Sequence, residues 1–484
     1  MATKISGGAA QGAPERRSAD QRIRSALGVL FPVPAEVGPR SLDLRLAGVA
    51  LQVGTIVLGA GLLLVRIPGL PPWDSLYLDD YGTFFVRALE HPWQLFSPQH
   101  GYVQVLPHVI AQLATYVPLS RVPEVFALSG ALIASACGLY VFHASAGHIQ
   151  SVTLRGLLAE AIVLLPIAPL ELADNTLGAP WYMLLALFWG VFWRPRTRTG
   201  TAVTAVLAFV TAASTSIAVL FAPLLAIRVY ALRRPREHAV TAGWLAGCLA
   251  QLPVIISSYS GGKSPLDNPS ASGMSLSFYA HDVVLPSLGW HLSWWLQSFA
   301  GRDGATAIVA VVLAAVFGLI VITQPQSRLF VTIALLAGFA ITVFSTTLVS
   351  YNSTTPAVTP NREFGARYTA LPIFLIEAAI IVGADCALRQ WGRKHLRSIA
   401  AWRPGLRPLT AMAVMALVAV MAVSWVPDFR YQNAIRINYT TGAWEKIVAQ
   451  WRLDCSVAWK GEINVRAIRA IPRDQMIPCD RLRF

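Results

Sequence analysis

This sequence has few charged residues. Asp, Glu, Lys and Arg make up 13% of its 484 residues, whereas a soluble domain carries about 25%. Only five cysteines are present, which excludes a disulfide-dense mini-protein, and 55% hydrophobic residues exclude a disordered chain. No repeat, low-complexity tract or heptad pattern stands out. The 39 basic residues outnumber the 25 acidic ones, but they occur in short runs between apolar segments. This distribution excludes a nucleic-acid-binding module and is typical of a multi-pass membrane protein.

The sequence contains many long runs of apolar residues. A bilayer core of about 30 Å takes roughly 20 residues of helix. We therefore predict an all-α polytopic membrane protein with about 11 transmembrane helices. The predicted spans are 46–65, 123–145, 156–170, 177–193, 201–213, 214–231, 240–258, 305–323, 328–349, 368–387 and 408–426. The third, fourth and fifth are short, as in helices that end early around a cavity.

The basic residues also predict the orientation. Segments 1–45, 194–200, 232–239 and 388–407 are rich in arginine, whereas the longer loops on the other side hold few basic residues. By the positive-inside rule the N-terminal segment is cytoplasmic. An odd number of spans in the transmembrane domain, 46–426, then places the tail, 427–484, outside the membrane.

The cysteines fit this topology. Cys137, Cys248 and Cys386 fall in apolar runs and are expected to be small buried hydrophobes. Cys455 and Cys479 lie in the tail, in a non-reducing compartment, and predict a structural disulfide. The apolar tail residues predict a small folded extracytoplasmic C-terminal domain; they are Trp444, Trp451, Trp459, Val465, Ile468 and Ile471.

The first outside loop, 66–122, is too long for a plain connector. Two sets of apolar residues in it recur at helical spacing and predict two amphipathic helices on the outer membrane surface. They are Phe84, Phe85, Ala88, Leu89 and Trp93, and then Leu106, Val109, Ile110, Leu113 and Val117.

Asp79 and Asp80 lie just before the first of these helices. Two adjacent carboxylates at a membrane boundary, in an acid-poor chain, favour a functional site. Because neighbouring side chains project in different directions, one would act on a substrate while the other binds a cation or orients its neighbour. The alternative is a helix N-cap, which accounts for one Asp better than for two.

An acidic pair directly after the first span, in a long loop of juxtamembrane helices, resembles the GT-C superfamily of integral-membrane glycosyltransferases. The resemblance covers the topology and roughly residues 44–200. The common form of the family's pair is Asp-Glu, whereas this sequence has Asp79-Asp80. The resemblance implies transfer of a single sugar from a polyprenyl-phosphate donor to a cell-envelope glycan, lipid or protein. It also implies a bacterial inner-membrane enzyme whose site faces outward.

By the same resemblance, Asp79 is the catalytic base. It would take the proton of the acceptor hydroxyl as that oxygen attacks the anomeric carbon, in an inverting direct displacement without a covalent intermediate. Asp80 would support it or help to hold a divalent cation. The two carboxylates with His100 or His108 offer hard ligands for Mg²⁺ or Mn²⁺. Several relatives need no metal, so metal dependence stays open.

Two further sets of residues are candidates for binding the substrates. Arginine binds phosphate oxygens in a bidentate way, and the donor-phosphate candidates are Arg362, Arg367 and Arg87, with Lys263 weaker. Interfacial anchoring is the alternative for Arg367, and a pair with Glu90 for Arg87. Polar and aromatic side chains suit a sugar; the sugar or acceptor candidates are Glu171, Asp174, Asn175, Trp181, His100 and Tyr102. For the turn at 171–182, an aromatic belt with a helix N-cap is the alternative.

Two other functions remain open. A transporter or flippase of a lipid-linked glycan would need polar residues near the membrane midplane, but Glu160 and Glu377 are the main mid-span charges. An O-antigen polymerase or ligase would use a lipid-linked oligosaccharide. The early, outside position of the acidic pair favours a transferase of single sugars.

Overall fold

The structure is a computed structural model. It describes residues 19–34, 42–77, 79–99, 102–164, 172, 175–259, 276–348, 367–395, 406–429, 443–458, 461–464 and 476–482. Several residues singled out above lie outside these ranges: His100, Glu171, Asp174, Lys263, Arg362, Trp459, Val465, Ile468 and Ile471.

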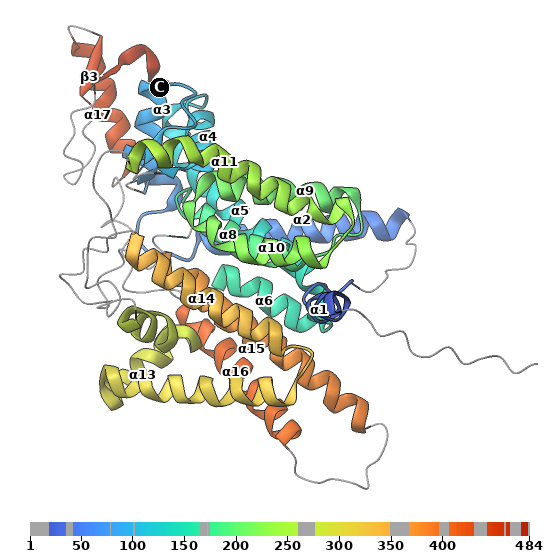
Figure 1. Cartoon of the computed structure of the whole chain (residues 1–484). Coiled ribbons are helices and arrows are strands. Elements are labelled where there is room, and N and C mark those ends of the chain that lie inside the picture. The colour runs from blue at the N-terminus through green and yellow to red at the C-terminus, as the bar shows by residue number, and fades with distance from the viewer. Residues whose placement is uncertain are drawn as a thin grey trace, which may run out of the picture.

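Most of the described chain is helical (Figure 1). The helices are α1 (Ala19–Gly28), α2 (Leu42–Leu64), α3 (Val86–Glu90), α4 (Val105–Ala114), α5 (Val122–Ala144), α6 (Val152–Leu164), α8 (Ala179–Phe192), α9 (Arg198–Ser214), α10 (Ala222–Ala231), α11 (Ala239–Tyr259), α13 (Trp290–Thr323), α14 (Arg328–Leu348), α15 (Arg367–His395), α16 (Leu406–Asp428) and α17 (Trp444–Val457). A π-helical segment, η2 (Asp80–Phe85), precedes α3, and a 3-10 segment, η5 (Ser216–Phe221), precedes α10.

Two short antiparallel strand pairs complete the described chain. The first joins β1 (Pro98–Gln99) to β2 (Tyr102–Val103), with Gln99 opposite Tyr102. The second joins β3 (Glu462–Asn464) to β4 (Met476–Pro478), with Ile463 opposite Ile477.

Seven of the described helices are long and apolar enough to cross a membrane. They are α2, α5, α11, α13, α14, α15 and α16, and they confirm a multi-pass helical membrane protein. Each of the other four predicted spans also overlaps a helix: α6, α8, α9, or η5 with α10. Because these are short, the count of eleven crossings stays a prediction.

α15 lies at the centre of the helical body. Figure 1 shows α13 and α16 on one side of it and α2, α5 and α8 to α11 on the other, with α6 between, while α14 packs along it. In its apolar stretch 94% of the residues are buried, because helices pack against it from both sides. It begins at Arg367, so a rigid, buried element positions this candidate arginine.

The long helix α13 contains a kink at Gly301, where φ is +71°. A positive φ is readily adopted by glycine because it has no Cβ. Before the kink, Trp294, Trp295 and Phe299 are all exposed. The kink therefore separates an exposed, aromatic segment from the predicted span at 305–323.

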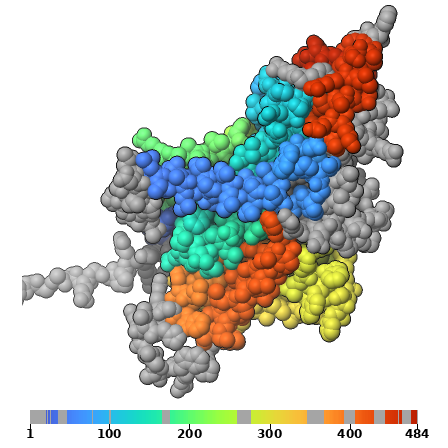
Figure 2. Space-filling model, turned by 180° about the vertical axis from the view of Figure 1, so that it is seen from behind, coloured from blue at the N-terminus to red at the C-terminus, as the bar shows by residue number. Residues whose placement is uncertain are grey.

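The C-terminal tail packs on the first outside loop (Figure 2). Trp444 and Trp451 of α17 lie 6.2 Å and 6.1 Å from the ring of Tyr81, between ring centroids. The indole N–H of Trp444 also donates to the Leu119 carbonyl at 2.7 Å. The described apolar side chains of the tail and of this loop thus form one cluster. Loop and tail accordingly lie on the same side of the membrane.

This packing changes the interpretation of the first loop. Phe84, Phe85, Ala88 and Leu89 are all buried, although their spacing predicted a helix lying on the membrane surface. They pack with Trp444 and its neighbours, which are more than 300 residues away in the chain. In this half of the loop a protein surface therefore covers the apolar face. In α4, Leu113 remains exposed.

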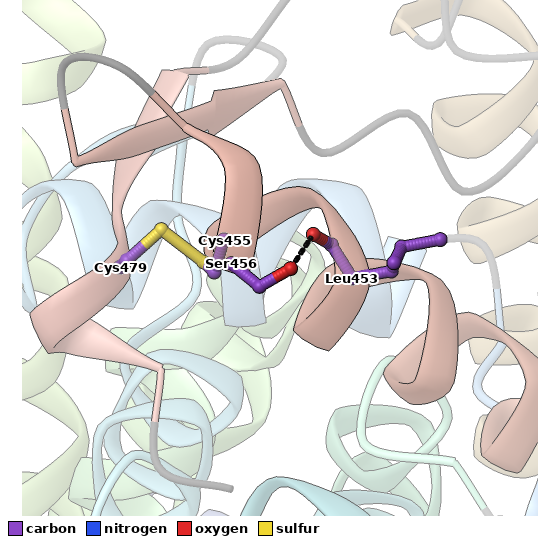
Figure 3. Close-up of a disulfide and its surroundings, with 4 residues drawn as sticks. All are labelled: Leu453, Cys455, Ser456 and Cys479. Carbon is purple, nitrogen blue, oxygen red and sulfur yellow. Dashed lines mark hydrogen bonds between the residues drawn. A yellow bond between two sulfur atoms is a disulfide. The ribbon is translucent and has the colours of Figure 1, made fainter.

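A disulfide joins Cys455 to Cys479, with Cα atoms 5.7 Å apart (Figure 3). It ties the last turn of α17 to the residue that follows β4. Next to it, the Ser456 hydroxyl donates to the Leu453 carbonyl at 2.6 Å. The bond therefore fastens the strand pair to the helix that packs on the first loop.

The disulfide gives a test of the topology. In intact spheroplasts, a membrane-impermeant maleimide is expected to label Cys455 and Cys479 only after an impermeant reductant has been added. Buried thiols react poorly, so Cys137 and Cys386 should stay unlabelled. The double variant Cys455→Ser/Cys479→Ser is the control and should show no labelling. Labelling that requires permeabilised membranes would contradict an outside tail.

Candidate active site

The two carboxylates of the acidic pair lie in different surroundings. Asp80 is buried and accepts hydrogen bonds from the backbone N–H of Thr176 at 3.1 Å and from its hydroxyl at 2.5 Å. Asp79 is half-buried, and its Oδ1 accepts a bond from the Thr83 hydroxyl at 3.3 Å. Neighbouring residues on a helix project in different directions, so only Asp79 is accessible to a substrate.

Asp80 has a positioning role. It binds the backbone of Thr176 and of Leu177, and so it ties η2 to the turn that leads into α8. Burial, and then the charge of Asp79, raise the pKa of Asp80 to about 7, although the hydrogen bonds from Thr176 and Leu177 oppose this. The carboxyl thus changes protonation near neutral pH without facing the solvent.

The raised pKa predicts a pH effect on stability. Between pH of about 4 and 7 the folded state holds a proton on Asp80 that the unfolded chain has lost, so stability should fall as pH rises through this window and level off above it. A shift from 3.8 to about 7 corresponds to about 4 kcal/mol. Asp80→Asn, which cannot titrate, should flatten the pH dependence of the thermal unfolding midpoint. Equal slopes for wild type and variant would contradict this.

The N-cap alternative does not account for Asp79. It stands at the N-cap position of η2, yet its side chain makes no capping bond there. Asp80 makes backbone bonds of the capping kind, but to the turn before α8, which is 96 residues away in the chain. The half-buried Asp79 carboxylate is therefore not explained by the start of its own helix.

Tyr102 links Asp79 electrostatically to the first residues of α15. The phenol of Tyr102, on β2, has a pKa raised first by burial and then by Tyr368 and Asp79, whereas the Arg367 charge lowers it. Such charge effects require that these groups lie close together. The guanidinium of Arg367 lies 5.3 Å from the Tyr368 ring, and the Trp181 ring meets Tyr368 edge-on at 5.1 Å. The predicted base, one predicted phosphate ligand and two predicted sugar contacts are thus linked through Tyr102 and Tyr368.

Tyr102 is held by bonds to the strand that carries it. The Gln251 side chain of α11 accepts from the Val103 N–H at 2.7 Å and donates to its carbonyl at 2.8 Å. The Gln104 amide donates to the Tyr102 hydroxyl at 3.1 Å. A buried amide that satisfies both backbone groups fixes the strand, and so the phenol keeps its place beside Arg367.

The turn before α8 matches the helix-start alternative more than a sugar site. Asn175 is 1% exposed, and its Oδ1 accepts the Gly178 N–H at 2.6 Å. Its side-chain oxygen is therefore used within the protein. Trp181, one turn further on, is 8% exposed and presents little of its ring to a sugar.

Arg87 lies near His108, because its charge acts on the imidazole. The Arg87 Nε is buried without a partner among the described residues, and no ion pair with Glu90 is found there. Burial, followed by the Arg87 charge, lowers the pKa of His108 to about 4, so this imidazole is neutral at pH 7. His108 packs against the Phe84 ring at 5.2 Å. It is thus a buried neighbour of Arg87, and the described contacts do not join either residue to Asp79.

The magnesium or manganese site stays a prediction, since its candidate ligand His100 lies outside the residues that the structure describes. No three of their His, Cys, Asp and Glu side chains are grouped as metal ligands. The Asp80 oxygens are bound by Thr176 and Leu177, which leaves Asp79 as the one carboxylate of the pair open to a ligand.

Two residues at the site had no assigned role from the sequence. Tyr368 was only the first residue of the predicted span 368–387, and its contact with Trp181 was not predictable. No pattern in the sequence pointed to Thr176, because its bond to Asp80 joins residues 96 positions apart. Long-range pairings of this kind become visible only in the folded chain.

No protein-family model matches this chain, and no curated protein is significantly similar to it in sequence. The function is therefore argued from the residues and their geometry.

Proposed function

We propose that the protein is a membrane glycosyltransferase. It transfers a single sugar from a polyprenyl-phosphate donor to a cell-envelope glycan, lipid or protein on the extracytoplasmic side. The observation that carries the proposal is that Asp79, the half-buried carboxylate of the pair, lies in the same region as Tyr102 and Arg367, whose charges act on one another. A carboxylate, a phenol and a guanidinium in one place supply a base, a hydroxyl contact and a phosphate ligand.

The proposed reaction uses Asp79 as the base. The acceptor hydroxyl gives its proton to the Asp79 carboxylate, while its oxygen forms a bond to the anomeric carbon of the donor sugar. The bond between that carbon and the phosphate oxygen breaks, and its electron pair stays on the departing polyprenyl phosphate. Thr83, which donates to Asp79 at 3.3 Å, keeps the carboxylate oriented.

Arg367 stabilises the leaving phosphate in this proposal. Its planar guanidinium donates two parallel hydrogen bonds to phosphate oxygens, and it neutralises charge as the sugar–oxygen bond breaks. The position at the first residue of α15 suits a lipid donor, because the polyprenyl chain can stay in the membrane while its phosphate reaches the outer surface.

The test is sugar transfer by the purified protein from a panel of radiolabelled polyprenyl-phosphate sugars, with envelope extract as acceptor. One donor should be consumed and its label recovered in an envelope product. Consumption of no donor would remove the support for a transferase. Movement of an intact lipid-linked glycan across vesicles would then favour a flippase, and growth of a lipid-linked oligosaccharide would favour a polymerase or ligase.

A further inference from the structure

A strongly basic cavity lies at the opposite end of α8 from Asp80. The turn before α8 binds Asp80, whereas the cavity lies just after its last residue, Phe192. A helix of 14 residues separates them by about 21 Å. The cavity measures about 550 Å³ and is lined by Val33, Arg194, Arg196, Arg234, Arg236 and Glu237, together with one proline. It thus lies between the loops that join α8 to α9 and α10 to α11.

The lining carries an excess of positive charge. It holds four arginines and one glutamate, and that glutamate is already engaged. Glu237 Oε1 accepts from Arg194 Nε at 2.8 Å and from its Nη2 at 2.5 Å. Four arginines and one glutamate give the lining a net charge of +3, and like charges around one cavity repel. An anion bound between them would relieve this repulsion.

Hydrogen bonds hold the walls of the cavity in place. The buried Arg228 donates to the backbone carbonyls of Glu237, at 2.8 Å, and of Val191. Arg236 Nη1 reaches across to the Arg196 carbonyl at 3.3 Å. Arg228 thus ties the α10–α11 loop to the end of α8, and Arg236 ties the same loop to the α8–α9 segment. A site fixed before binding loses little free energy to ordering.

We infer that this cavity binds a phosphate-bearing anion. Guanidinium groups pair with phosphate oxygens in a bidentate way, and several converge here on a volume that suits a headgroup. The cavity lies at the ends of membrane helices on the side that the charge distribution assigns to the cytoplasm. Basic pockets between membrane helices on that side bind anionic lipid headgroups. A soluble phosphate compound shares this chemistry, and the experiment distinguishes the two sources.

Thermal unfolding of the purified protein in neutral detergent provides the test, with two probes titrated separately at constant ionic strength. Tetraoleoyl cardiolipin represents a lipid headgroup, and inorganic pyrophosphate represents a soluble anion. A ligand of the folded state raises the unfolding midpoint. We expect cardiolipin to raise the midpoint of the wild type. We expect Arg234→Gln/Arg236→Gln to weaken its apparent affinity by at least about tenfold, since each lost arginine removes charge-assisted bonds.

A second pair of variants controls for charge alone. Arg198, the first residue of α9, and Arg233, in the α10–α11 loop, are exposed, but they do not line the cavity. Arg198→Gln/Arg233→Gln removes the same charge and should change the affinity by less than about twofold. A response to pyrophosphate alone, lost in the first pair, would keep the anion site and identify its ligand as soluble. No response to either probe, or equal weakening by both pairs, would overturn the inference.

Discussion

Replacing Asp79 by Asn is expected to slow sugar transfer by at least about a hundredfold. Asn keeps the size of the side chain and can still accept the bond from Thr83, but it cannot take the proton of the acceptor hydroxyl. The protein should fold normally, because Asp79 is half-buried and makes no capping bond. The measurement is the turnover rate with the donor identified from the polyprenyl-phosphate panel, and the unfolding midpoint is recorded beside it.

Glu90→Gln is the matched control for this experiment. Glu90 is a half-buried carboxylate at the end of α3, in the same loop, and its neutralisation should leave turnover within about threefold, as expected for a surface change away from the reacting atoms. If Asp79→Asn turns over at the wild-type rate, Asp79 is not the base, although the transferase class could stand. Equal losses in both variants would point to loop charge and not to proton transfer.

Removing the Trp444 side chain is expected to release the tail from the first loop. Trp444 is 1% exposed and bonds to the Leu119 carbonyl. Truncating such a buried Trp to Ala costs about 3–5 kcal/mol. Because this contact joins two segments, the loss should raise the undocked fraction of the tail at least about a hundredfold. Limited proteolysis of the purified protein would detect it as faster cleavage between α16 and α17.

Two further variants make this prediction specific. Trp444→Phe keeps an aromatic ring against Tyr81 but loses the indole N–H, so it should cost less than the alanine variant. Trp294→Ala removes an exposed aromatic side chain from α13 and should leave the cleavage rate of the tail unchanged. Unchanged cleavage in Trp444→Ala would show that the cluster with Tyr81 and Phe85 does not hold the tail. Sugar transfer should fall when the tail undocks. Tyr81 packs against Trp444 and directly follows Asp80, so the loss of docking reaches the acidic pair.

The apolar runs predicted the helices well, because a membrane helix must satisfy its backbone bonds within itself. Every predicted span overlaps a helix of the structure. For amphipathic helices, the sequence was less informative about what covers the apolar face. The apolar face of residues 84–89 predicted contact with a membrane, and a protein surface covers it instead. The partner is a tail more than 300 residues away, and helical periodicity does not distinguish lipid from a protein partner.

The sequence by itself determined that this is a multi-pass helical membrane protein, because composition and run length act locally. It also singled out the acidic pair and Arg367, since ionisable groups are few in this chain. Only the tertiary structure decided which carboxylate stays accessible and which one binds the turn before α8. It also decided that Tyr102 lies beside Arg367 and that Arg87 lies with His108. These outcomes depend on contacts between distant segments, and such contacts are fixed only when the whole chain packs.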